Sequence, residues 1–338
     1  MIESAILWAF YVLAAATIGI AGFYLSKFGN IIADKTGLGG TVIGLVLLAT
    51  VTSLPELFTG ITAVTAADAP NIAVGGTIGS CIFNLLILMM LELVYPKASI
   101  YTRIAQGHIL SAGFGVIIIG FATLRIVAGG SGPVFAIGYI GIETPILIAL
   151  YILAMQVTTR YERAAAEAGT TETAAQWPDI SLTQAVVGYT VASVFVGAAG
   201  ISMPFIAERL AANMGWNNSF VGTSLVALST SLPELTVVLA AARIGALDMA
   251  IANLLGSNLF DALILAIEDI FYTKGPLLAV VSQVHAATGV SAMIMSGAVI
   301  TAVFTRPAGR PLRLVGWTGI FLLMMYVMNA YLIYIYGA

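Results

Sequence analysis

The chain has 338 residues, of which 60% are hydrophobic and only 9% charged, and its formal net charge is −3. Soluble domains carry roughly a quarter of charged residues, so this composition excludes an ordinary soluble protein and indicates one that lies in a lipid bilayer. The small negative charge argues against a nucleic-acid partner, and the single Cys81 excludes an intramolecular disulfide framework.

Apolar segments long enough to cross the hydrocarbon core follow one another along the whole chain. A transmembrane helix needs about 20 apolar residues. By this measure the sequence predicts an all-α integral membrane protein with ten spans, at residues 5–26, 41–67, 71–95, 105–127, 134–157, 182–207, 218–243, 247–271, 277–304 and 312–336. We expect the first span to be retained, because Glu3 stands where a signal peptide carries a basic residue.

Two motifs in the first half of the chain return in the second half. The second span carries Thr52-Ser53-Leu54-Pro55-Glu56-Leu57, which recurs 178 positions later as Thr230-Ser231-Leu232-Pro233-Glu234-Leu235. The third carries Gly79-Ser80-x-x-Phe83-Asn84, which recurs as Gly256-Ser257-x-x-Phe260-Asp261. We therefore predict two five-span repeats, 1–157 and 182–338, joined by a cytoplasmic linker at 158–181. Because five is an odd number, the repeats must be inverted in the membrane.

Basic residues are distributed unequally between the two faces of this arrangement. The loops after odd-numbered spans hold ten of the 13 Lys and Arg residues, and only Arg125, Arg209 and Lys274 lie on the other face. Loops rich in Lys and Arg stay in the cytoplasm. The sequence therefore predicts a multi-pass protein of the plasma or inner membrane, with the linker in the cytoplasm and both termini outside.

The prolines in the paired motifs indicate broken helices. Pro55 and Pro233 each lack an amide hydrogen and clash with the carbonyl four residues earlier, which frees that carbonyl in mid-membrane. A dehydrated cation can satisfy such a carbonyl. A carboxylate at the bilayer centre costs at least about 2.5 kcal/mol, so Glu56 and Glu234 in matched positions favour cation binding over packing.

The next span of each half supplies further oxygen atoms. Ser80 and Asn84, like Ser257 and Asp261, are four residues apart and therefore share one helix face. A set of oxygen ligands without His or Cys suits Ca²⁺ or Na⁺ rather than zinc or copper. An alternative explanation for the two serines is that small residues let helices pack closely.

These ordered motifs resemble the alpha-repeats of sodium/calcium exchangers in the cation/calcium antiporter superfamily. The signature of that family is Gly-Thr-Ser-Leu-Pro-Glu followed by Gly-Ser-x-x-x-Asn or Asp. The likeness covers both repeats and, through the ten-span plan, nearly the whole chain. The sequence departs from the family at Val51 and Ser229, which replace a glycine, and at Gly76, where asparagine is frequent. These departures bear on ion selectivity.

The resemblance implies a secondary active antiporter, not an enzyme, that exchanges Ca²⁺ for Na⁺ by alternating access. It implies that Glu56 and Glu234 bind Ca²⁺ and share in sodium sites, with backbone oxygens of Thr52 and Thr230. The resemblance also implies an inner sodium site formed by Ala49, Ser53, Ser257 and Glu234. It implies an outer sodium site formed by Ala227, Ser231, Ser80 and Glu56. Asn84 and Asp261 match the remaining central pair of the family.

Other transport classes stay open at this point. Protons could drive calcium transport through the same glutamates, with His108 and His285, although these histidines more often lie at a membrane interface without a transport role. The run 75–80 also resembles the potassium-dependent branch, and a cation channel remains a further alternative. Apart from transported Ca²⁺ and Na⁺ and the lipid bilayer, we expect no cofactor and no obligate protein partner.

Several carboxylates lie near span ends. Glu92 aligns with Asp269, and Glu268 adjoins Asp269, near the ends of the third and eighth spans, while Glu143 begins the fifth. Their symmetric position is compatible with a role at an ion entrance. We favour interfacial side chains that reach water, because long polar side chains snorkel from the edges of a bilayer.

Overall fold

The computed structural model describes residues 2–36, 48–95, 99–129, 135–168, 179–309 and 315–337, and most of them are helical. The predicted spans 41–67, 134–157 and 312–336 begin outside these ranges. Residues 169–178 of the predicted linker also lie outside them.

The described elements follow the order of the chain. The first half contains α1 (Ile2–Thr36), α3 (Ala49–Thr52), α4 (Leu54–Thr65), α5 (Pro70–Val94), the 3-10 helix η2 (Ile100–Thr102), α6 (His108–Gly129), β1 (Ala136–Ile137), β2 (Ile140–Gly141) and α7 (Glu143–Ala168). The second half contains α8 (Leu182–Met214), α9 (Asn218–Phe220), the π-helix η3 (Val221–Val226), α10 (Ala227–Thr230), α11 (Leu232–Ile244), α12 (Leu247–Phe271), α13 (Leu277–Val280), α14 (Val284–Thr305) and α15 (Trp317–Tyr336).

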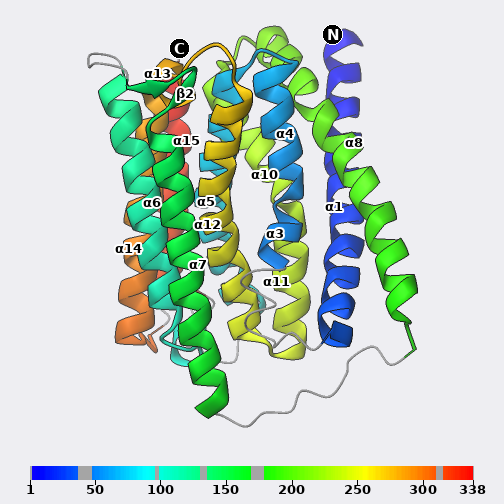
Figure 1. The fold of residues 1–338 in the computed structure, drawn as a ribbon, viewed down its shortest axis with the longest axis vertical. Helices are drawn as coiled ribbons and strands as arrows, with labels where there is room; N and C mark the ends of the chain where they lie inside the picture. Colours follow the sequence, from blue (N-terminus) through cyan, green and yellow to red (C-terminus); the bar gives the residue numbers. More distant parts are fainter. Residues whose placement is uncertain are drawn as a thin grey trace.

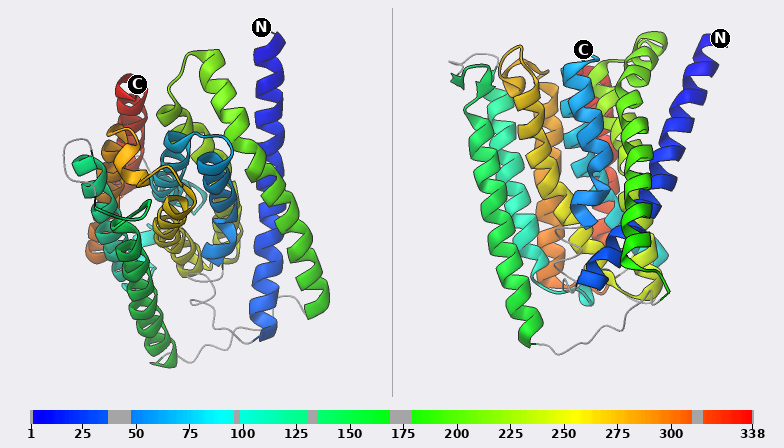
Figure 2. Two further views of the ribbon diagram at one scale, coloured as in Figure 1. Left: turned by 45° about the horizontal axis from the view of Figure 1, so that its top comes forward. Right: turned by 45° about the vertical axis from the view of Figure 1, so that its right-hand side comes forward.

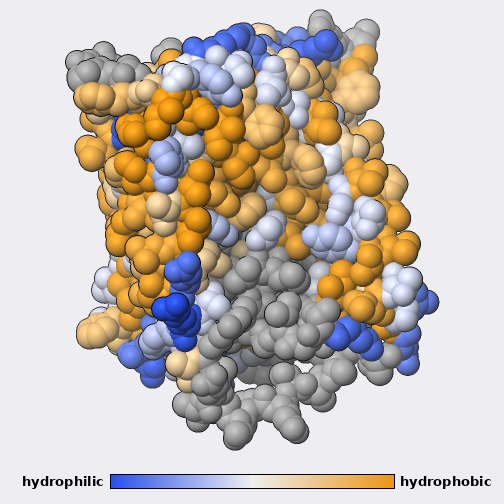
Figure 3. Space-filling view, viewed as in Figure 1, coloured by the Kyte–Doolittle hydropathy of each residue, from blue (hydrophilic) through white to orange (hydrophobic). Residues whose placement is uncertain are grey.

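The helices have the length and surface of a membrane protein. Seven helices among the described residues are long and apolar enough to cross a bilayer: α1, α5, α6, α8, α12, α14 and α15. The segment from Asn218 to Thr230 forms an eighth span with α11 if this pair, bent by 42° at its break, is counted as one. Hydrophobic residues cover most of the side surface in Figure 3, and hydrophilic ones gather toward its two ends. The chain is therefore a multi-pass membrane protein.

The two most buried long helices, α5 and α12, lie in the middle of the bundle. In their most apolar stretches 78% and 89% of residues are buried, against 28% to 50% in the other candidate spans. Figures 1 and 2 show α1 and α8 side by side at one edge, and α6, α7, α14 and α15 toward the other. The short helices α3, α4, α10 and α11 lie between these groups, next to α5 and α12.

Both chain termini lie at one end of the bundle, which we call the termini end (Figure 1). The end of α7 and the start of α8 lie at the opposite end, which we call the linker end. Helix α4 lies toward the termini end from α3, whereas α11 lies toward the linker end from α10. The two broken segments therefore run in opposite directions.

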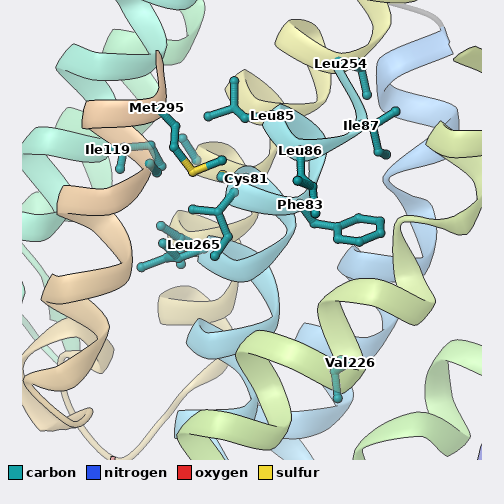
Figure 4. Packing of buried hydrophobic residues seen from close by; sticks show 14 of the residues in the cluster. Cys81, Phe83, Leu85, Leu86, Ile87, Ile119, Val226, Leu254, Leu265 and Met295 are labelled. Carbon is teal, nitrogen blue, oxygen red and sulfur yellow. The ribbon is translucent and has the colours of Figure 1, made fainter. Parts of the chain in front are cut away.

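Apolar packing fixes α5 from several directions. Figure 4 shows Cys81 of α5 among Met295 of α14, Ile119 of α6 and Leu265 of α12. Within the described residues, these four side chains belong to one large buried apolar cluster. Because close-packed interiors resist displacement, the polar residues of α5 are held at fixed positions relative to α12.

Some predicted span boundaries are wrong. Residues 136–141 form a two-stranded hairpin that turns at Gly138, whose φ is +67°, so α7 begins at Glu143 and not at residue 134. Helix α7 then continues to Ala168, eleven residues into the predicted linker. Helix α1 extends to Thr36, while its candidate span, Ser4–Gly29, agrees with the predicted 5–26. A hydropathy criterion predicts the apolar part of a helix and not its polar extension.

The expectation that the flanking carboxylates reach water is also wrong. Glu92, Glu268, Asp269 and Glu143 are all at most 1% exposed. Asp269 accepts hydrogen bonds from the amides of Gly141 and Leu277, and Glu143 pairs with Arg125, with 3.2 Å between Nε and Oε1. The inward-facing groups are covered by the hairpin and by neighbouring helices, which a linear pattern does not show.

The two histidines are buried and paired. His108 lies 2.9 Å from an Asp248 carboxylate oxygen, and His285 lies 3.3 Å from the amide oxygen of Asn71. Each contact joins the start of one span to the start of a span in the other half. Both histidines lie at the start of a candidate span, as the sequence predicts, with their side chains buried against the protein.

Candidate cation site

The two glutamates of the repeated motif begin the second segment of each broken helix. The chain breaks at Ser53 and Ser231, whose backbone angles are nearly identical, with φ −87° and −86° and ψ 10° in both. The proline that follows each break suits the first turn of a new helix, because its missing amide hydrogen is not needed there. Glu56 and Glu234 thus lie in first turns, where the helix dipole favours a negative charge.

The Glu56 side chain is 3% exposed and is held by hydroxyl groups from both halves. Ser80 of α5 donates to Oε1 at 3.2 Å, and Ser231 from the other break donates to the same oxygen at 3.1 Å. The serine of the neighbouring long helix and the serine of the opposite break therefore fix the orientation of this carboxylate.

Glu234 has the corresponding environment. Its side chain is fully buried, and its Oε1 accepts hydrogen bonds from Ser53 at 3.3 Å and from Ser257 at 3.2 Å. Each glutamate is thus bound by one serine from its own half and one from the other. These hydrogen bonds between the two halves hold both breaks together at the centre of the bundle.

The threonines of the motif lie beside backbone carbonyls. The Thr52 hydroxyl donates to the Ala49 carbonyl at 3.3 Å, and that of Thr230 lies 3.3 Å from the Ala227 carbonyl. Thr52 also lies 3.3 Å from the Ser257 hydroxyl. Thr52 therefore contacts a serine that donates to Glu234, and both threonines lie in the turn that precedes a break.

Asn84 and Asp261 each contact a residue in the other half of the molecule. The Asn84 amide donates to Asn258 Oδ1 at 3.1 Å, and the Cys81 thiol lies 3.5 Å from Asp261 Oδ2. Because Ser80, the residue before Cys81, donates to Glu56, the carboxylates of Glu56 and Asp261 contact adjacent residues of α5. We group these residues with Glu234 as one polar cluster.

Four oxygens of this cluster lack hydrogen-bond partners among the described residues. They are Glu56 Oε2, Asn84 Oδ1, Glu234 Oε2 and Asp261 Oδ1, and each is buried. A buried acceptor without a partner costs roughly 1–3 kcal/mol, and more when it is charged. The serines satisfy one oxygen of each glutamate, and the other oxygen is available to a ligand; carboxylate oxygens are ligands that hard cations prefer.

Acidic side chains alone do not complete this site. Within the described part of the chain, no three Asp, Glu, His or Cys side chains converge closely enough to chelate a metal. An ion at the centre would therefore need hydroxyl, amide and carbonyl oxygens beside the carboxylates. Such mixed oxygen sets are typical of Ca²⁺ and Na⁺.

Sequence reasoning missed two neighbours of this cluster. Cys81 and Asn258 lie three residues before Asn84 and Asp261, and both contact the opposite half. The sequence analysis used the i, i+4 spacing of Ser80 with Asn84 and of Ser257 with Asp261. Positions three residues apart lie on the same helix face as well. The matched places of Cys81 and Asn258 in the repeats were the available signal.

Comparisons with known proteins identify the family of the chain. Both halves match the family model described as sodium/calcium exchanger protein, over residues 6–160 and 181–335. An uncharacterized membrane protein of Methanocaldococcus jannaschii is 30% identical over 233 residues, covering 68% of this chain and 70% of that protein. The sodium/calcium exchanger MaX1 of Methanosarcina acetivorans is 36% identical over 124 residues, 36% of this chain and 32% of MaX1.

A solved structure has the same fold. The sodium-calcium exchanger NCX_Mj, soaked with Na⁺ and Sr²⁺, superposes on this chain with a TM-score of 0.64 at 24% sequence identity. The match covers 96% of this chain and 97% of that one. The fold similarity therefore extends over almost the full length of both proteins.

Proposed function

Because the chain belongs to the sodium/calcium exchanger protein family, we propose that it exchanges Ca²⁺ for Na⁺ across the membrane by alternating access. The observation that carries this proposal is the set of four buried oxygens without partners at the centre of the bundle. Competition of Ca²⁺ and Na⁺ for one carboxylate cluster couples the two fluxes, since an empty cluster of charged carboxylates is costly in a low dielectric.

The proposed architecture is ten transmembrane helices in two inverted repeats, 1–157 and 182–338. Two features support it. The family model matches the chain twice, once in each half, and the two broken segments run in opposite directions. In this architecture the two glutamates come from equivalent positions and meet near the membrane midplane.

The proposed Ca²⁺ ligands are the carboxylates of Glu56 and Glu234 with the backbone carbonyls of Thr52 and Thr230. Ca²⁺ accepts six to eight oxygens with flexible geometry. Na⁺ would bind at two flanking positions: Ala49, Ser53, Ser257 and Glu234 for one, and Ala227, Ser231, Ser80 and Glu56 for the other. Each glutamate is then shared between ions, and Asn84 and Asp261 complete the centre.

We propose that α1 and α8 slide along the central helices to expose the site to alternate sides. Gly22 of α1 packs against the Pro233 ring, and the equivalent Gly200 of α8 packs against the Pro55 carbonyl. These glycines correspond at the 178-residue offset of the repeats. Smooth helix surfaces at both breaks permit close contact and sliding.

The proposal places the protein in the plasma or inner membrane with the linker end in the cytoplasm. The excess of Lys and Arg in the loops on that side supports this orientation. The transported ions and the surrounding lipid are the partners that this function requires.

Transport into proteoliposomes tests the function. Vesicles loaded with Na⁺ are diluted into Na⁺-free medium with labelled Ca²⁺, and the same uptake is measured under K⁺ and proton gradients imposed one at a time. We expect Ca²⁺ uptake driven by the Na⁺ gradient alone. Ca²⁺ uptake that does not depend on the Na⁺ gradient but depends on a proton or K⁺ gradient contradicts the proposed coupling. Uptake without saturable counterflow indicates a channel.

A further inference from the structure

A fourth buried carboxylate lies outside the proposed cation site. The Glu268 side chain on α12 is fully buried, and its Oε1 accepts a hydrogen bond from the Thr77 hydroxyl of α5 at 2.7 Å. The backbone of α4 presses on the same oxygen, because a Cβ added to Gly60 would overlap it. Oε2 has no hydrogen-bond partner among the described residues.

This carboxylate lies between the central cluster and the termini end. Glu268 is seven residues after Asp261, which is about two helical turns or 10 Å along α12. Helix α12 runs toward the termini end in Figure 1. On α4, Gly60 lies one turn beyond Glu56 in the same direction. Glu268 therefore contacts the helix segment that carries one of the proposed Ca²⁺ ligands.

The three equivalent positions in the other half of the molecule carry apolar residues. At the offsets that align the repeats, Gly60, Thr77 and Glu268 correspond to Val238, Leu254 and Leu91. All three of these side chains are fully buried. Helix packing at this depth is therefore achieved without an acid, and the carboxylate of Glu268 has a different reason to be present.

The surroundings of Glu268 fit a proton better than a metal ion. Ca²⁺ needs six to eight oxygens, whereas among the described residues only the Thr77 hydroxyl reaches this carboxylate, and the α4 backbone closes one side of it. An ionised carboxylate with one neutral donor is strongly unfavourable in an apolar interior, and a neutral acid is far less so.

We propose that Glu268 binds an exchangeable proton on the path between the cation site and the termini end. The proton is held while α4 packs on the carboxylate. When α4 withdraws and water reaches Glu268, the proton leaves to that water and an anionic carboxylate remains. This proposal rests on the proposed exchange function in one respect, the measurement of transport in proteoliposomes.

Other charged groups near α12 do not replace Thr77 as the partner of Glu268. On the described parts of the elements packed against α12, the acidic, basic and thiol groups are Glu56 on α4, Cys81 and Glu92 on α5, His108 and Arg125 on α6, Glu143, Arg160 and Glu162 on α7, and Glu234 and Arg243 on α11. Among the described residues, the hydrogen bond to Glu268 comes from Thr77, and no ion pair reaches it. On α12 itself, Asp261 and Asp269 are the nearest carboxylates in sequence, and Asp269 is bonded elsewhere.

Infrared difference spectroscopy tests the proton directly. Spectra of the detergent-solubilised protein are compared between acidic and alkaline buffer in wild type and in Glu268→Gln, with Glu208→Gln on the exposed face of α8 as control. We expect a protonated-carboxyl band that titrates in wild type and in the control and is lost in Glu268→Gln. Thr77→Val should shift the frequency of this band, because it removes the hydrogen bond that the carboxyl group accepts.

Three outcomes overturn the proposal. The first is a difference spectrum of Glu268→Gln equal to that of wild type, and the second is an unshifted carboxyl band in Thr77→Val. The third is loss of the Glu268 band on addition of Ca²⁺ or Na⁺ at constant pH, which would indicate that Glu268 binds the metal ion. If Glu268→Gln does not fold, Glu268→Asp serves instead, with a shifted band expected. In proteoliposomes, the change of Na⁺-driven Ca²⁺ uptake with pH at the termini end should shrink in Glu268→Gln. A band that behaves as expected without Na⁺/Ca²⁺ exchange would contradict the proposed function alone.

Discussion

At the residue scale, the central glutamates have a divided environment. Two serine hydroxyls hold one oxygen of each carboxylate, while the other oxygen is buried without a partner among the described residues. The serines therefore orient Glu56 and Glu234, and the free oxygens are left for an ion. This division separates the effects expected from substituting a glutamate and from substituting a serine.

Removing the negative charge of either glutamate should abolish exchange. Glu56→Gln and Glu234→Gln keep the size of the side chain but remove the charge that we propose binds Ca²⁺, and we expect Ca²⁺ affinity to fall by at least about tenfold, or ~1.4 kcal/mol. Isothermal titration of the purified protein with Ca²⁺ measures this change. Glu208→Gln, on the exposed face of α8, is the matched control and should bind as wild type does. Unchanged affinity in either central variant contradicts the assigned ligands.

Removing a serine should have a smaller effect. Ser231→Ala and Ser257→Ala each delete one donor to a glutamate oxygen, which is worth about 0.5–1.5 kcal/mol, or ~2- to 10-fold in Ca²⁺ affinity. Because Ser231 acts through Glu56, a double-mutant cycle of the two should be non-additive. Ser231 with Glu234, which are not hydrogen-bonded to each other, provides the comparison, and additive energies for Ser231 with Glu56 would exclude the positioning role.

At this scale the sequence predicted the centre of the site better than its borders. Ten of the twelve proposed ligands came from the two repeated motifs, and Ala49 and Ala227 lie three residues before the first motif in each half. The serines and glutamates of the motifs do contact one another in the structure. Cys81, Asn258 and Glu268 were missed or misjudged, because their roles depend on which helix of the other half lies opposite. A single sequence shows the two repeats, but it does not show which helix face of one repeat packs against which face of the other.

At the element scale, the breaks depend on close contact with α1 and α8. Gly22 of α1 leaves room for the Pro233 ring at the second break, whereas Gly19, one turn earlier on the same helix, has ordinary contacts starting at 3.4 Å with Leu232. The first break has the same relation to α8 through Gly200. Each break therefore depends on a helix from the other half of the chain.

A methyl group at Gly22 should disturb this contact. We expect Gly22→Ala to destabilise the protein by about 1–3 kcal/mol, because the added Cβ would overlap the proline ring. Thermal unfolding in detergent should show a lower midpoint, and exchange in proteoliposomes should be slower. Gly19→Ala is the control and should match wild type in both measurements. Equal stability of the two variants would show that α1 accommodates the methyl group without cost.

Helix boundaries were the weakest sequence predictions at this scale. Hydropathy ends a span where polar residues begin, yet α7 continues from Arg160 to Ala168 because a helix that has formed propagates into polar sequence at low cost. The hairpin at 136–141 is as apolar as a span, and only the turn at Gly138 distinguishes it. The prolines gave the breaks at Ser53 and Ser231 correctly, since their effect on a helix is local.

At the scale of the whole molecule, the two ends of the bundle differ in chemistry although the halves match. Glu268 lies between the site and the termini end, and its equivalent in the other half, toward the linker end, is Leu91; both side chains are fully buried. The two halves therefore differ at this pair of positions, by an acid on one side and an apolar residue on the other. This asymmetry has a functional meaning only when each end is assigned to one side of the membrane.

Cysteine labelling in intact cells tests that assignment. The native Cys81 is buried and should not react, so Asp179→Cys at the exposed linker end and Tyr336→Cys at the exposed termini end give a low background. With the Lys- and Arg-rich loops in the cytoplasm, we expect an impermeant thiol reagent to label Tyr336→Cys in intact cells, and Asp179→Cys only after permeabilisation. Both variants should be labelled equally in detergent. The reverse pattern would invert the orientation and place Glu268 on the cytoplasmic route, where protons from inside the cell would reach it.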